Sequence, residues 1–149
     1  MTAALHLANP EDLARIAPMV ATFHAGEGVA SDSAHIEAAL APILEGSPHG
    51  CVYLIGPRKA PIGYAILTFG WSVALGGLVG TLDEFFIREG VRGRGIGTEA
   101  LAALQRTMAE AGVKALQLEV RDENTQAKTL YGRRRFVARD TYQVMRWVP

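Results

Sequence analysis

Residues 82–97 read Leu82-Asp83-Glu84-Phe85-Phe86-Ile87-Arg88-Glu89-Gly90-Val91-Arg92-Gly93-Arg94-Gly95-Ile96-Gly97. Residues 81–87 are mostly apolar and aromatic, a composition typical of a strand. Residues 92–97, the glycine loop, follow a short polar connection. Apolar residues then recur at helical spacing from Ile96 to Met108, and Gly112 ends that pattern. The stretch therefore predicts a strand and a helix joined by a glycine-rich loop.

The glycine loop has the features of an anion-binding site. Gly93, Gly95 and Gly97 permit positive φ angles and close backbone approach, which leaves N–H groups free to point at an anion. The N-terminus of the following helix adds its dipole. Arg92 and Arg94 add full positive charges. Together these features favour a pyrophosphate site over a flexible turn.

Two common phosphate motifs compete for this loop. A nucleoside-triphosphate loop needs a Lys-Ser/Thr pair after its second glycine, and the glycine loop has none. Residues 95–100 do satisfy the dinucleotide pattern G-x-G-x-x-A, and Glu119 follows near the place of a ribose-binding acid. That fold, however, places its first glycine directly after its first strand and needs several more parallel strands. The context therefore argues against a dinucleotide site.

The rest of the chain predicts further helices and strands. Asn9-Pro10 has the residues of a helix start, with asparagine as N-cap and proline at the first helical position. Helices are expected after residue 9, from Asp32 or Ser33 to residue 46, from residue 96 to Gly112, and at residues 124–134. Strands are expected at residues 4–8, 50–55, 61–71, 81–87, 115–120 and 142–148. This order predicts an α/β fold with a mixed sheet.

Residues 1–149 read as a single domain, because no linker or repeat interrupts them. The final strand could support a homodimer. Residues 60–82 carry no charge, but their five glycines favour two strands and a loop over a membrane span. The N-terminus lacks the basic and apolar regions of a secretory signal. The one cysteine, Cys51, lies in an apolar run and is expected to be a core residue in a reducing cytoplasm.

Charge and composition exclude some partners. Fifteen basic residues balance fifteen acidic ones, so the net charge gives no reason to expect nucleic acid or an anionic membrane as partner. The histidines have no metal-like spacing, and one cysteine cannot form a cysteine-based zinc site, so no metal is expected.

Two motifs, in order, resemble the GNAT superfamily of N-acetyltransferases. The pattern Arg92-x-x-Gly95-x-Gly97 after residues 82–87 is similar to that family's fourth strand and pyrophosphate loop. Residues 118–120, the pattern Asn124-x-x-Ala127-x-x-x-Tyr131 and Phe136 look like its fifth strand, following helix and closing strand. The resemblance covers most of the chain. The sequence departs from the family at Arg135, where a glycine is usual. This departure concerns the local backbone at that turn and not the donor site.

The resemblance implies a mixed, mostly antiparallel central sheet flanked by helices, in which the fourth and fifth strands splay apart. It also implies that acetyl-CoA, or a close acyl-CoA, is the acyl donor, with its pantetheine arm between those strands. The implied donor-binding residues are Phe85, Phe86, Ile87, Arg92, Gly93, Arg94, Gly95, Ile96, Gly97, Thr98, Asn124, Ala127 and Tyr131. Residues 133–135 are interpreted as a solvated basic face in preference to a site for the ribose 3′-phosphate.

Acyl transfer from a thioester to an amine needs a base for the amine and an acid for the leaving thiolate. The resemblance makes Tyr131 the acid. Asp83 and Glu84 are candidate bases, because charged groups in a strand beside a cleft are costly unless they are functional or exposed. Strand alternation sends them to opposite faces, so only one faces the substrate unless a bulge intervenes. The sequence does not decide between the two.

Acceptor contacts are expected after the first helix and near the end of the third strand, where His24, Glu27, Phe69 and Trp71 lie. The predicted function is acetyl-CoA-dependent transfer of an acetyl group to a primary amine of a small molecule or peptide, by direct attack in a ternary complex. The alternative from another class is a non-catalytic acyl-CoA-binding sensor. Such a module would keep the glycine loop but would not need Tyr131 or the two acids.

Overall fold

The computed structural model describes residues 4–149. Residues 1–3 lie outside that range. They are the first residues of the N-terminal stretch that is expected to lack a secretory signal. A five-stranded sheet runs through the centre in the order β1-β2-β3-β4-β5. The first four strands pair antiparallel and β5 pairs parallel to β4. The strands are β1 (Leu5–Leu7), β2 (Gly50–Ile55), β3 (Gly63–Ser72), β4 (Gly77–Ile87) and β5 (Ala115–Leu118).

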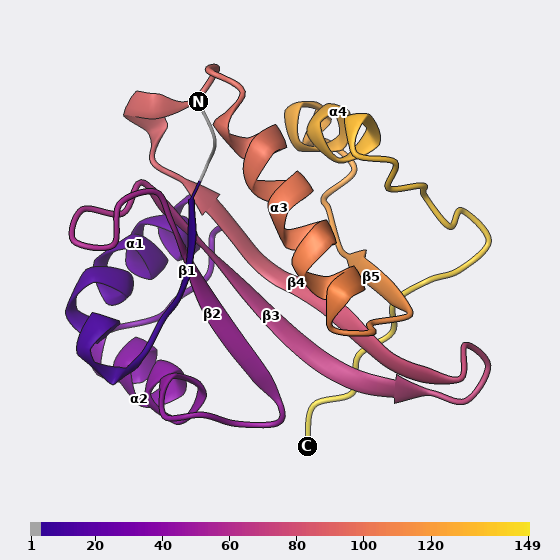
Figure 1. Ribbon diagram of the computed structural model, residues 1–149, viewed down its shortest axis with the longest axis horizontal. Coiled ribbons are helices and arrows are strands. Elements are labelled where there is room, and N and C mark those ends of the chain that lie inside the picture. The colour runs from indigo at the N-terminus through magenta and orange to yellow at the C-terminus, as the bar shows by residue number, and fades with distance from the viewer. Residues whose placement is uncertain (1–3) are drawn as a thin grey trace.

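Helices cover both faces of this sheet (Figure 1). The helices α1 (Leu13–Gly26) and α2 (Ser33–Leu44) pack on one face, and α3 (Ile96–Glu110) packs on the other, with α4 (Thr125–Arg133) beside it. The predicted start at Asn9 is confirmed, because its side chain accepts a hydrogen bond from the amide of Glu11 (2.9 Å). That cap begins a short 3-10 helix (Pro10–Asp12) that leads into α1.

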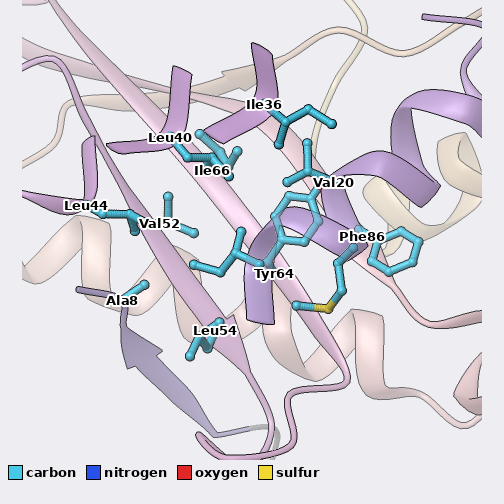
Figure 2. Close-up of a cluster of buried hydrophobic side chains, with 12 residues drawn as sticks. Ala8, Val20, Ile36, Leu40, Leu44, Val52, Leu54, Tyr64, Ile66 and Phe86 are labelled. Atoms are coloured by element: carbon cyan, nitrogen blue, oxygen red, sulfur yellow. The ribbon is translucent and has the colours of Figure 1, made fainter. Parts of the chain in front are cut away.

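The core between the sheet and the helices α1 and α2 surrounds one tyrosine. Tyr64 on β3 is fully buried there, among aliphatic side chains from α1, α2 and β2 (Figure 2). Its ring lies 5.7 Å from that of Phe86, measured between centroids. A buried tyrosine needs a partner for its hydroxyl. That partner comes from β4 and belongs to the candidate site described below.

A β-bulge changes the side-chain alternation along β4. In the register with β3, Ile66 pairs with Glu84 and Leu67 pairs with Leu82, so Asp83 is the extra residue. Leu82 consequently packs toward α3, whereas Phe86 packs toward α1. Without the bulge these two residues, four positions apart, would face the same side.

The strands β4 and β5 separate after a short stretch of pairing. Their ladder runs from Val79↔Ala115 to Leu82↔Leu118 and stops there. Residues 83–87 of β4 therefore present one edge that is not paired with another strand of the described chain. The mixed sheet and its splayed fourth and fifth strands are confirmed.

The predicted final strand at residues 142–148 is wrong. Residues 137–149 form no strand and are exposed throughout, with Met145 89% and Trp147 84% exposed. The segment leaves α4 and ends apart from it (Figure 1, yellow). Its residues favour extended backbone, but strand formation depends on pairing with a neighbour, and no ladder within residues 4–149 includes them.

The uncharged stretch at residues 60–82 forms β3 and the first part of β4, as predicted. A four-residue turn, residues 73–76, joins the two strands. Among the helices of residues 4–149, none is both long and apolar enough to cross a membrane.

Candidate active site

A cleft of about 1110 Å³ opens where β4 and β5 part. It is bordered by the end of α1, the bulged half of β4, the glycine loop, the start of α3, the segment after β5, and α4. Residues lining it include Thr22, His24, Glu27, Asp83, Glu84, Phe85, Phe86, Ile87, Arg92, Gly93, Gly95, Ile96, Gly97, Thr98, Glu119, Arg121, Asn124, Ala127, Leu130, Tyr131 and Arg146. Its volume suits a ligand at least as large as a typical small-molecule cofactor.

The glycine loop has a backbone that only glycine adopts readily. Gly93 and Gly95 both have φ of +78°, and Gly95 is the N-cap of α3. Gly97 is favoured for a different reason. A Cβ at this position would lie 3.3 Å from Leu130 of α4, so the glycine allows the two helices to approach closely.

The amides of the loop and of the first turn of α3 are available to a ligand. Within residues 4–149, the N–H groups from Gly93 to Thr98 donate to no acceptor. They lie at the positive end of a 15-residue helix. This is the arrangement in which helix N-termini bind phosphate groups.

The two arginines of the loop have different environments. Arg92 donates from Nε to the carbonyl of Ile87 (2.7 Å), and its guanidinium lies 5.7 Å from the ring centroid of Phe86. Arg92 therefore anchors the loop to the end of β4. Arg94 is exposed, does not line the cleft, and forms no ion pair with the described residues.

Glu84 is held by two donors from different elements. The hydroxyl of buried Tyr64 donates to Oε1 of Glu84 (2.8 Å). Nε2 of His24, in the last turn of α1, lies 2.8 Å from Oε2, and Nδ1 of His24 lies 2.7 Å from Oγ of Ser31. An ionised carboxylate only accepts hydrogen bonds, so Nε2 of His24 carries the proton in this contact. Burial, followed by the charge of Glu84, raises the pKa of Tyr64 far above its ordinary value. That phenol therefore remains a donor.

Asp83 is exposed at the bulge and makes no hydrogen bond with the described residues. Partial burial of its carboxyl raises the pKa of Asp83, with a further contribution from Glu84, while His24 acts in the opposite direction. Both acids line the cleft, at the bulge that interrupts the alternation of β4. Glu84 is the fixed carboxylate of the pair.

Tyr131 lies on α4, across the cleft from these acids. Its ring packs edge-on against Phe136, with 5.8 Å between centroids. Its hydroxyl has no hydrogen-bond partner among residues 4–149 and is not sealed from solvent. Burial, with a smaller contribution from the charge of Glu27, raises the pKa of Tyr131. The phenol is therefore protonated at neutral pH and can donate a proton.

The ends of α4 are fixed by two caps. At the start, Oδ1 of Asn124 accepts from the amide of Ala127 (3.1 Å). At the end, the amides of Arg135 and Phe136 donate to the carbonyls of Gly132 and Tyr131. Arg135 has φ of +66°, the left-handed conformation that glycine favours. Arg135 therefore adopts the backbone conformation of a glycine cap, and the arginine bears the conformational strain.

The structure brings most of the predicted site residues into the cleft, including both acids, Tyr131, His24, Glu27 and the donor-binding set other than Arg94. Phe69 and Trp71 do not line it. They lie in the distal half of β3, opposite Gly80 and Leu78, and Trp71 is 73% exposed. Cys51 is half-buried against the α3 side of the core, and burial raises its pKa.

Sequence reasoning missed three residues that shape the site, namely Ser31, Tyr64 and Arg121. Arg121 follows β5, and its guanidinium contacts Glu27 at the end of α1. It donates to the side-chain carboxylate of Glu27 (3.2 Å) and to the main-chain carbonyl of Glu27 (2.8 Å). Tyr64 offered one signal, as a phenol in the apolar first half of β3, residues 63–67. Ser31 and Arg121 lie in connecting segments, where no periodicity indicates which residues meet.

Comparison with known proteins agrees with this geometry. The Acetyltransferase (GNAT) family model matches residues 18–136. A solved structure from Arthrobacter sp. FB24, described as an acetyltransferase, is 29% identical, with 98% of this chain and 94% of that chain covered and a TM-score of 0.79. An integron cassette protein from the mobile metagenome of Cole Harbour Salt Marsh is 26% identical, with 97% and 90% covered and a TM-score of 0.84.

A third structure, a possible acetyltransferase from Clostridium difficile 630, has a TM-score of 0.88 over 100% of this chain and 99% of that chain. At 17% identity it shows the shared fold alone. A search of curated proteins finds no match. The family match spans most of the chain, including the glycine loop, the bulged β4 and α4. The chain therefore belongs to the GNAT family of acetyltransferases.

Proposed function

We propose that this acetyltransferase moves an acetyl group from acetyl-CoA to a primary amine of a small molecule or peptide, by direct attack in a ternary complex. The observation that carries the proposal is the cleft itself. It combines unpaired loop amides, an open edge of β4, a fixed carboxylate at Glu84 and an accessible phenol at Tyr131. These are the groups that thioester aminolysis requires.

The residues around the cleft fit acetyl-CoA in two places. The free amides of Gly93 to Thr98, at the N-terminus of α3, would bind the pyrophosphate. The unpaired edge at Phe85, Phe86 and Ile87 would hydrogen-bond the pantetheine amides as a neighbouring strand would. Asn124 and Ala127, at the start of α4, line the opposite wall. The donor supplies the activated thioester carbonyl.

The side chains of the cleft supply the proton transfers. Glu84 takes the proton of the acceptor's ammonium group, because its carboxylate is oriented by Tyr64 and His24. N–H groups on the open edge of β4 stabilise the negative charge that develops on the thioester oxygen. Tyr131 gives its proton to the departing thiolate. Because the pKa of Tyr131 is raised, the phenol stays protonated until the thiolate departs.

The charges at the acceptor end favour a cationic amine. Asp83 and Glu84 lie together at the bulge, and Glu27 lies at the end of α1. Of these, Glu27 is paired with Arg121 and Glu84 contacts His24, whereas Asp83 has no ion-pair partner among the described residues. An incoming ammonium group would interact favourably with Asp83 and would then lie next to the base.

Ligand binding provides a direct test of the donor. Acetyl-CoA is expected to raise the melting temperature of the protein in a thermal-shift assay, whereas NAD is not. Stabilisation by NAD alone would contradict the proposal and revive the dinucleotide interpretation of the glycine loop.

We also propose that residues 1–149 act as one acetyltransferase domain and that the chain forms a homodimer. Support for the dimer comes from the C-terminal tail, residues 137–149. Its exposed large side chains are Val137, Tyr142, Val144, Met145, Trp147 and Val148. Large exposed apolar side chains that gather in one segment favour an interaction site.

A further inference from the structure

A hydrogen-bonded chain of three side chains links the loop after α1 to the bulge of β4. Oγ of Ser31 lies 2.7 Å from Nδ1 of His24, and Nε2 of His24 lies 2.8 Å from Oε2 of Glu84. The side chains of His24 and Glu84 are only 16% and 17% exposed. The imidazole is therefore held on both sides, and water has little access to the contact.

The same carboxylate is also held from the core. Tyr64 donates to Oε1 and His24 donates to Oε2, so each oxygen of Glu84 has one lone pair occupied. The remaining lone pairs are free to accept a proton from a ligand in the cleft. A carboxylate fixed by two donors needs no reorientation when the acceptor arrives.

We propose that His24 is a positioning residue for acetyl transfer, which orients Glu84 as the base while Ser31 fixes the imidazole from the opposite side. The proposal rests on the proposed function, in which Glu84 takes the ammonium proton. His24 does not touch the reacting atoms in this account. It acts by keeping the carboxylate aimed into the cleft.

Loss of His24 would leave Oε2 of Glu84 without its donor, whereas Tyr64 would still hold Oε1. The carboxylate could then turn away from the acceptor. The loss would therefore fall on the acetyl-transfer step and not on donor binding.

The test compares kcat and the KM for the amine in wild type, His24→Ala, His24→Gln and Ser31→Ala, with acetyl-CoA affinity measured by calorimetry. His24→Ala is expected to reduce kcat about tenfold, part of the roughly 10²–10⁴ that a general base contributes. The KM for the amine and the affinity for acetyl-CoA should stay unchanged. His24→Gln retains an N–H near Nε2 and should recover part of kcat. Ser31→Ala should lower kcat less than His24→Ala.

His35→Gln, on the exposed side of α2, is the matched control and should match wild type. If His24→Ala does not fold, His24→Gln and Ser31→Ala carry the test through kcat at unchanged KM. Normal kcat in all the variants that fold would overturn the role of His24 alone. Absence of turnover in wild type with every amine would instead overturn the proposed function.

Discussion

At the scale of single residues, Glu84 is the base that we propose for the cleft. It accepts hydrogen bonds from Tyr64 and His24, whereas Asp83 beside it accepts none from the described chain. Glu84→Gln keeps the shape of the side chain but removes the proposed base. We expect kcat to fall by about 100-fold or more, with acetyl-CoA affinity unchanged. The measurement is the release of CoA thiol with an amine acceptor.

Asp83→Asn is the matched control for that prediction. It removes the same charge one residue away, without breaking a hydrogen bond of the described chain. We expect it to raise KM for the amine more than it lowers kcat, because Asp83 would attract the ammonium group without taking its proton. A larger loss of kcat in Asp83→Asn than in Glu84→Gln would assign the base to Asp83.

Tyr131 makes a prediction about the alkaline side of the pH profile. Its pKa is raised by burial and by Glu27, so the phenol keeps its proton to higher pH than a free tyrosine, whose pKa is about 10. Activity should therefore not decline through ionisation of Tyr131 between neutral pH and about pH 10. Tyr131→Phe is expected to lower kcat at every pH while acetyl-CoA still binds. Full turnover in that variant would remove Tyr131 from the mechanism.

At the scale of elements, we propose that the glycine loop and α3 form the donor site together. Gly95 has φ of +78° at the start of α3, and Gly112 has φ of +82° after its end. A Cβ added at either position would meet no atom within 4 Å, so alanine at both would incur a similar backbone strain and no clash. We expect Gly95→Ala to weaken acetyl-CoA binding by calorimetry. Gly112→Ala should cost comparable stability and leave that affinity unchanged.

The C-terminal cap of α4 offers a stability test. Arg135 occupies the left-handed position of the cap with φ of +66°, where a non-glycine residue costs roughly 1–2 kcal/mol. Arg135→Gly should therefore raise the free energy of unfolding, by up to about 1 kcal/mol after the entropy of glycine is counted. Arg133→Gly, within the helix, should lower it. Denaturant titration of both variants checks the pair, and destabilisation by Arg135→Gly would refute the account of the cap.

The elements could be predicted where a local signal defines them. The cap at Asn9, the glycines around α3 and the apolar spacing of the helices each depend on neighbouring residues alone, and the structure contains these elements. The bulge at Asp83 depends on pairing with β3, so alternation could only leave the choice between the two acids open. The strand expected at residues 142–148 is absent because propensity without a pairing partner does not form a strand.

The contacts of the site were less predictable than its residues. The glycine loop and Tyr131 belong to motifs with fixed spacing. The contact of Glu84 with His24 and Tyr64 joins residues 60 and 20 positions apart in sequence. Nothing in the spacing of these three residues indicates that they meet, because the packing of α1 on the sheet determines it.

At the scale of the whole molecule, the C-terminal tail predicts self-association. Its six large apolar side chains are exposed, and β5 is the last strand of the sheet among the described residues. A standard interface buries about 800 Å² per partner, and we propose that the tail supplies the apolar part of it. Light scattering after gel filtration should report a dimer, and deletion of residues 137–149 should yield a monomer. A monomeric full-length chain would contradict the proposal.

The central claim is that the cleft binds acetyl-CoA and transfers its acetyl group to an amine. The most direct measurement is CoA thiol release from acetyl-CoA across a panel of primary amines and peptides, with mass spectrometry of the acceptor and Glu84→Gln as the control. We predict amine-dependent release, an acetylated product from the same reaction, and loss of both in Glu84→Gln. Tight binding of acetyl-CoA with no release for any amine would contradict the claim and favour a non-catalytic acyl-CoA sensor.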